Sequence, residues 1–168
     1  MATAASMARA KPDGFVRLVA SQRLHSDPER VVALLGSDPP WSGVFSAGTE
    51  VAGLRRYAID LRLRIGGDST GLTTFSKAAY LDLGRPRRTT HGWEIEISWR
   101  ASTAAPLFPV FSGRLLVGPE KLQIEGLYAP PGGAVGRVAD RMLLHVAANA
   151  TARWLLDEVD RAALGAAL

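Results

Sequence analysis

Two stretches of the chain alternate strictly between hydrophobic and polar residues, which predicts half-buried β-strands. The first stretch covers residues 56–65, and its apolar positions are Tyr57, Ile59, Leu61, Leu63 and Ile65. The second covers residues 93–100, and its apolar positions are Trp93, Ile95, Ile97 and Trp99. Because successive side chains of a strand point to opposite faces of a sheet, each stretch is expected to present one face to the core and the other to water.

Four other stretches carry the same signal less regularly, and they cover residues 15–24, 73–83, 110–117 and 122–127. Short turns rich in glycine and proline separate the later strands, which predicts a meander of consecutive antiparallel strands. The expected sheet has about six to seven strands. Arg62 and Arg64 are expected to pair with Glu94 and Glu96 if their strands are neighbours. Residues 43–53 are too irregular to assign.

Two short helices are expected after the first strand. Ser26 and Glu29 form a capping-box pattern, and Pro28 suits a first helical turn because its missing N–H would have no partner there. This helix is expected to end at Gly36. Residues 37–41 then predict a second short turn or helix start.

A long helix is predicted at the C-terminal end, because no helix breaker other than Gly136 occurs between residue 134 and Gly165. About 30 residues of helix span roughly 45 Å, so this helix is expected to cross the whole sheet. Polar residues fall four apart on the predicted outer column, which contains Arg137, Arg141, His145, Asn149, Arg153, Asp157 and Arg161. The predicted inner column is apolar or small and contains Ala139, Leu143, Ala147, Thr151, Leu155 and Val159.

The fold class indicated by these patterns is α+β: a curved antiparallel sheet wrapped around a long C-terminal helix. With 168 residues, the chain fits a single domain over residues 15–168, and residues 1–14 are interpreted as a mobile leader. The absence of cysteine excludes disulfides, thiolate metal sites and thiol nucleophiles, and it is compatible with a reducing cytoplasm. No strongly apolar stretch is long enough and free enough of charge to predict a transmembrane segment.

The formal charge of +4 raises the question of an anionic partner. Basic residues are scattered among acidic ones, however, and the one compact cluster is Arg85, Arg87 and Arg88 in a turn. A solvated hairpin tip is the favoured interpretation, with an anion or membrane-surface contact as the alternative. A nucleic-acid partner is not expected, and the oligomeric state is left open.

The junction between the last predicted strand and the long helix resembles a known family. Its sequence is GLYAPPGGAVGR at residues 126–137, followed by DRMLLH at residues 140–145. It is similar to uncharacterised bacterial members of the helix-grip superfamily, which includes START lipid-transfer domains, birch-pollen allergens and polyketide cyclase/dehydratase-like (SRPBCC) proteins. The resemblance covers the chain after residue 14. It implies a pocket between sheet and helix, but it brings no catalytic set to positions of this chain.

A small hydrophobic molecule is the predicted ligand, either polycyclic or lipid-like, bound between the sheet and the long helix. The candidate ligand-binding residues are Tyr57, Phe75, Trp93, Ile95, Ile97, Trp99, Leu143, Ala147 and Thr151. Tyr128 is a further candidate for the pocket wall. The same aromatic residues also suit an ordinary filled core, and both interpretations remain open at this point.

A binding or carrier domain is the leading functional hypothesis, and an enzyme of the cyclase, aromatase or dehydratase type acting on a polyketide-like substrate is the alternative. A domain that acts through its surface is a third possibility. His145 is expected to face water in the polar column, and no nucleophile or carboxylate accompanies His25 or His91. Catalytic residues are therefore unknown, and neither a metal nor a cofactor is predicted.

Overall fold

The computed structural model describes residues 15–37, 48–65, 73–102, 110–129 and 138–165. Within these ranges, the side chains of residues 61–65, 73–77, 138–144 and 147 are not described. The predicted leader at residues 1–14 and most of the second short helix therefore lie outside the described residues. The elements along the chain are β1 (Val16–Arg23), α1 (Pro28–Leu35), β2 (Thr49–Val51), β3 (Leu54–Ile65), β4 (Thr73–Leu83), β5 (Arg87–Thr89), β6 (Gly92–Ala101), β7 (Val110–Val117), β8 (Lys121–Ala129) and α2 (Val138–Gly165).

All described strands form one antiparallel sheet of eight strands. The spatial order is β1-β8-β7-β6-β4-β3-β2, and β5 pairs with the start of β6. The first and last strands of the chain are therefore neighbours, which brings the end of β8 and the start of α2 back to the N-terminal strand. The sequence patterns predicted ranges for six strands, and the two strands without a predicted range are the three-residue strands β2 and β5, which are too short to produce a recognisable alternation.

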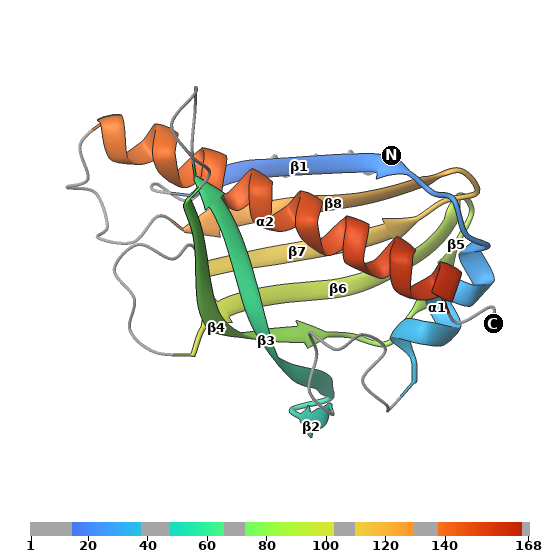
Figure 1. The fold of residues 1–168 in the computed structure, drawn as a ribbon. Coiled ribbons are helices and arrows are strands. Elements are labelled where there is room, and N and C mark those ends of the chain that lie inside the picture. The colour runs from blue at the N-terminus through green and yellow to red at the C-terminus, as the bar shows by residue number, and fades with distance from the viewer. Residues whose placement is uncertain (1–14, 38–47, 66–72, 103–109, 130–137, 166–168) are drawn as a thin grey trace, which may run out of the picture.

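Helix α2 lies across the concave side of this sheet, as Figure 1 shows, with β3 and β4 curving up beside it. The helix packs mainly on β1 and β3, and it also contacts α1 and β8. Its 28 residues agree with the predicted length, and the polar column is exposed or half-buried at every described position from His145 to Arg161. Thr151, Leu155 and Val159 of the predicted inner column are buried. The side chains of Ala139, Leu143 and Ala147 lie outside the described residues.

The predicted cap of α1 is wrong by one residue. Asp27, not Ser26, is the N-cap, and its carboxylate accepts a hydrogen bond from the backbone N–H of Glu29 at 2.8 Å. The Ser26 hydroxyl instead donates to Asp160 of α2 at 2.9 Å. A long-range partner therefore takes the side chain that the local pattern assigned to capping.

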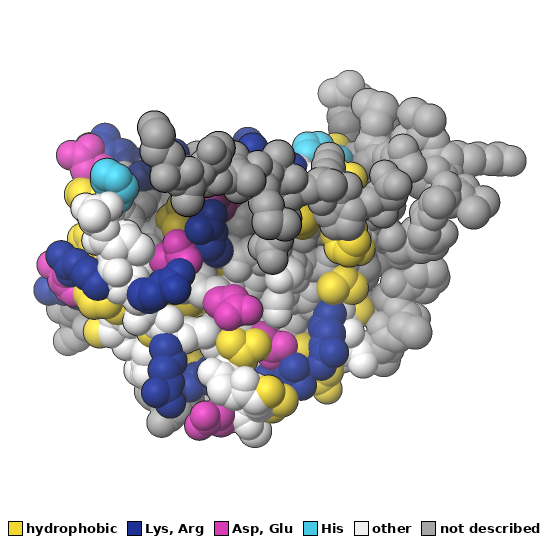
Figure 2. Space-filling view, turned by 180° about the vertical axis from the view of Figure 1, so that it is seen from behind, with side chains coloured by type: hydrophobic (Ala, Val, Ile, Leu, Met, Phe, Trp, Pro, Cys, Tyr) yellow, Lys and Arg dark blue, Asp and Glu magenta, His cyan; other side chains and the backbone are white. Residues whose placement is uncertain are grey.

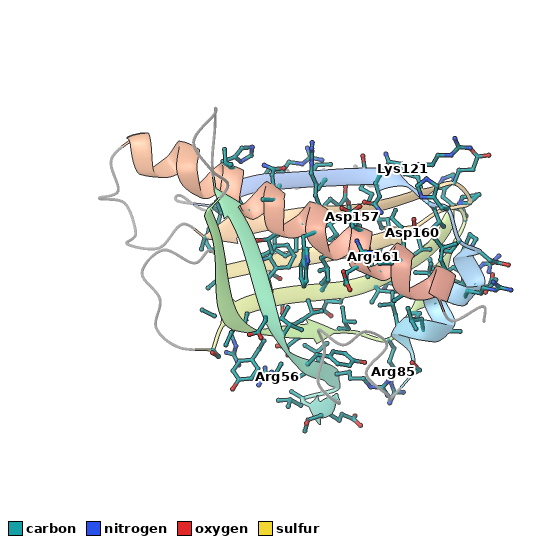
Figure 3. The ribbon with its side chains drawn as sticks, in the orientation of Figure 1. Arg56, Arg85, Lys121, Asp157, Asp160 and Arg161 are labelled. Atoms are coloured by element: carbon teal, nitrogen blue, oxygen red, sulfur yellow. The ribbon has the colours of Figure 1, made fainter. Side chains whose placement is uncertain are left out.

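Asp160 fastens the C-terminal part of α2 to the connection between β1 and α1 (Figure 3). Its buried carboxylate accepts hydrogen bonds from the backbone N–H groups of His25 and Ser26, from the Ser26 hydroxyl and from the His25 ring at 2.8 Å. Burial raises the pKa of Asp160, but these hydrogen bonds outweigh burial and hold the pKa below its ordinary value. The ionised carboxylate therefore stabilises the folded state.

The outer face of the sheet carries a ladder of ion pairs. Glu94 on β6 pairs with Arg87 on β5 and with Arg114 on β7, and Arg114 also reaches Glu125 on β8 at 2.6 Å. The condition set for a pairing with Arg62 and Arg64 is not met, because β4 lies between β3 and β6. Figure 2 shows basic and acidic side chains interspersed on this side of the molecule, and the described residues visible on this face form no continuous basic patch.

Candidate functional site

One row of paired residues crosses the concave face of the sheet. The register pairs Tyr57 with Leu81, Leu81 with Trp99, Trp99 with Phe111, and Phe111 with Tyr128. Directly paired residues of antiparallel strands point to the same face, and all five side chains are buried. The row therefore forms an apolar, largely aromatic floor beneath α2.

A pair of glycines shapes the middle of this floor. Gly113 on β7 is paired with Gly126 on β8. A Cβ atom added to either glycine would lie 2.7 Å from the tip of the Phe111 ring, which is closer than two non-bonded carbon atoms approach. The Phe111 ring thus occupies the space beside both glycines, and it stacks on Trp99 with ring centroids 3.9 Å apart. Because neither glycine carries a side chain, the rings of Phe111 and Trp99 can lie close against the sheet.

The helix covers this floor with mostly small side chains. Ala148, Thr151 and Ala152 are buried, and Leu155 follows one turn later. Within the part of the chain that the structure describes, two buried side-chain polar atoms have no hydrogen-bond partner: Trp99 Nε1 on the floor and Thr151 Oγ1 on the helix. Buried polar atoms without partners are rare in folded proteins and each needs an explanation.

A third polar group reaches the interior from the floor. The hydroxyl of buried Tyr128 lies 3.3 Å from Nδ1 of His145 on α2. His145 Nε2 lies 2.9 Å from Asn149 Nδ2, which also donates to the His145 carbonyl at 2.9 Å. Burial raises the pKa of Tyr128, so its phenol is held in the neutral form. The expectation that His145 is exposed is confirmed, but its ring also contacts a buried residue.

The nine candidate ligand-binding residues fall into three groups. Tyr57, Ile95, Ile97, Trp99 and Thr151 are buried between sheet and helix. Trp93 is half-buried at the α1 end, where its indole donates to Glu29 and Arg88 lies over its ring. For Phe75, Leu143 and Ala147 the structure describes no side chain.

Several interior residues were missing from the candidate residues, namely Phe111, Gly113, Gly126, Ala148 and Ala152. Phe111 follows the same alternation as the buried Leu115 and Val117 on β7, so its position was open to prediction. The glycine pair was not, because it depends on the register between two strands. Ala148 and Ala152 lie one position beyond the predicted inner column, which shows that the buried face of α2 is broader than that column.

Three surface clefts formed by described residues lie outside this interior. One of about 340 Å³ is lined by the end of α1, the β2–β3 hairpin and the loop before β5. One of about 470 Å³ lies beside Trp93 and the start of α1, and one of about 400 Å³ lies over the ion-pair ladder. Arginine and glutamate side chains line parts of all three clefts, which does not match the requirements of an apolar ligand.

Among the described residues, no three histidine, aspartate or glutamate side chains gather to hold a metal ion. Likewise, none of the described helices is long and apolar enough to span a membrane.

The arrangement of sheet and helix is a helix-grip fold, and solved structures confirm it. A protein from Thermus thermophilus, TTHA0849, has 12% sequence identity and a TM-score of 0.55, covering 91% of this chain and 100% of its own. The di-domain ARO/CYC protein BexL from the BE-7585A biosynthetic pathway has 16% identity and a TM-score of 0.56, covering 91% of this chain and 51% of its own. No family model and no curated protein sequence matches the chain.

Proposed function

We propose that this domain binds a small hydrophobic molecule between the concave face of the sheet and α2. The observation that carries the proposal is the pair of unpartnered polar atoms, Trp99 Nε1 and Thr151 Oγ1, in an otherwise apolar interior. Leaving a buried polar group unpaired costs about 1–3 kcal/mol. A ligand that supplies a hydrogen-bond partner would recover part of that cost, while its apolar surface contacts the aromatic floor and the small residues of the helix.

An enzyme of the cyclase, aromatase or dehydratase type acting on a polyketide-like substrate is the second candidate. The contact between buried Tyr128 and His145 favours it, because a phenol beside an imidazole is a group that can move a proton. The shared fold with BexL agrees with this alternative. The binding proposal needs fewer assumptions, since it requires only the interior and its unpartnered donors. A bacterial, cytoplasmic setting remains a prediction.

Native mass spectrometry provides the first test. Protein purified from its own host under non-denaturing conditions is expected to carry an additional small-molecule mass that disappears on denaturation. This measurement identifies a resident ligand without assuming its structure.

Titration with 2-ethylnaphthalene, an apolar two-ring probe, provides the second test. The four tryptophans give separate indole N–H resonances, and a Trp99→Phe variant identifies the signal of Trp99. We expect that signal to shift on titration while the signal of Trp93, whose indole donates to Glu29, stays in place. A shift confined to Trp93 would locate binding in the surface cleft. No shift at any indole, with no co-purifying mass, would show that the interior is a filled core.

A further inference from the structure

The direction of the hydrogen bonds around His145 can be worked out from Asn149. The Asn149 nitrogen that lies 2.9 Å from the His145 carbonyl must be the amide NH₂, because two carbonyl oxygens would repel each other at that distance. The same NH₂ group lies 2.9 Å from His145 Nε2. In the neutral imidazole Nε2 therefore accepts, and Nδ1 carries the proton.

This assignment fixes the role of the Tyr128 hydroxyl. Nδ1–H of His145 donates to the Tyr128 oxygen across 3.3 Å, so the hydroxyl acts as an acceptor toward the helix. Its own hydrogen stays available for another partner. Because Tyr128 is only 1% exposed, bulk water has little access to that hydrogen, and a group bound in the interior could accept it. An N–H bond to the oxygen also polarises the hydroxyl and strengthens it as a donor.

From this geometry we propose that Tyr128 is the residue that selects the polar end of the ligand, with His145 as its positioning residue, and that the ligand is an apolar ring system bearing a carbonyl or similar hydrogen-bond acceptor. The inference rests on the proposed interior binding site and specifies its ligand. Tyr128 and Trp99 are both paired with Phe111, so two strand spacings, roughly 10 Å, separate their backbones. A molecule of two or more fused rings matches that span.

The chain provides a matched control in Tyr57. This residue lies in the same row and is equally buried, but its hydroxyl already donates to the Ser37 carbonyl at 3.3 Å. Tyr57→Phe therefore removes a hydroxyl whose hydrogen is already bonded within the protein, so a ligand loses no hydrogen-bond donor.

The experiment compares two probes of nearly equal shape, 2-acetylnaphthalene with a carbonyl and 2-ethylnaphthalene without one. Affinities are measured by titration of the Trp99 indole resonance in the full chain. A net hydrogen bond in a binding site is worth about five-fold in affinity. We expect the unmodified protein to prefer the ketone by about five-fold, Tyr57→Phe to keep that preference, and Tyr128→Phe to abolish it while binding 2-ethylnaphthalene as before.

The stretching frequency of the bound carbonyl provides a second measurement that a purely structural role of His145 would not change. A hydrogen bond lowers this frequency, so Tyr128→Phe should raise it. His145→Ala should raise it part of the way at unchanged affinity for 2-ethylnaphthalene.

The possible failures can be told apart. Equal affinity of the unmodified protein for both probes, or a preference for the ketone that Tyr128→Phe retains, overturns the role of Tyr128 and leaves the interior site standing. Failure of both probes to bind overturns the proposed function and this inference together.

Discussion

Replacing Thr151 by valine is the sharpest test of the unusual interior. The Thr151 side chain is 1% exposed and its hydroxyl has no hydrogen-bond partner among the described residues. Valine has nearly the same shape and a similar helix propensity, so the substitution removes the unpaired hydroxyl and little else. Most substitutions of buried residues destabilise a protein, but this one is expected to stabilise it.

The size of the effect follows from the cost of an unpaired buried hydroxyl. That cost is about 1–3 kcal/mol, and we expect about 1–2 kcal/mol of it to be recovered. For a chain of this length, 168 residues, each kcal/mol shifts the midpoint of thermal unfolding by about 2–4 °C. Thr151→Val should therefore raise Tm by about 2–8 °C.

Thermal unfolding followed by circular dichroism, on protein freed of any resident ligand, measures this shift. Thr90→Val is the matched control, because Thr90 is exposed and its substitution should change stability by less than about 0.5 kcal/mol. If Thr151→Val leaves Tm unchanged or lowers it, the hydroxyl has a partner in solution, and an unsatisfied polar atom no longer supports the binding site. Stability given up to keep a polar atom in a core is typical of a functional site.

Three further substitutions test the packing around this interior. Gly126→Ala should destabilise the fold by about 1–3 kcal/mol, because its Cβ would lie 2.4 Å from the Ser112 carbonyl oxygen. Gly165→Ala is the control and should not destabilise the fold, since its Cβ would have nothing within 4 Å. Equal Tm values for the two variants would contradict the close approach of β7 and β8. Asp27→Ala should cost about 1 kcal/mol in urea unfolding through loss of the α1 cap, and a free energy of unfolding equal to that of the unmodified protein would show that the cap has been misassigned. Asp160→Ala should cost about 2–3 kcal/mol. Because the pKa of Asp160 is lowered in the folded state, its contribution is present above the unfolded pKa of about 4 and is lost as the pH falls through the folded pKa; a variant with the same acid unfolding curve as the unmodified protein would refute this.

The sequence was informative wherever one element's own pattern decided its structure. The alternation at residues 56–65 and 93–100 predicted most of the length of strands β3 and β6. The polar column of α2 predicted which side of the helix faces water. Both patterns arise from the geometry of a single strand or helix facing one apolar core. For the same reason the long helix could be recognised before its position on the sheet was known.

Prediction failed where a residue's role depends on a partner far along the chain. Ser26 suits an N-cap equally well in sequence, but its hydroxyl is bound by Asp160, 134 residues away. The meeting of Gly113 and Gly126 follows from strand register, which no local pattern specifies. His145 was correctly predicted to be exposed, yet its contact with Tyr128 depends on the height of α2 above β8.

The Asp160 contacts that hold α2 and the Tyr128–His145 contact of the candidate site lie at different places along the helix. Substitutions should therefore change stability and ligand recognition separately. Asp160 is 15 positions beyond His145, which corresponds to roughly 22 Å along the axis. The residues between them include the buried Leu155, Leu156 and Val159, which hold the helix on the sheet independently of either polar group. Loss of the Asp160 carboxylate should therefore weaken the fold without changing the discrimination between ketone and hydrocarbon probes. Loss of the Tyr128 hydroxyl should do the reverse. Mutations at distant sites without shared partners act additively, so a variant carrying both changes should show each effect at its full size. A deviation would mean that the Asp160 carboxylate also sets the position of His145 over Tyr128.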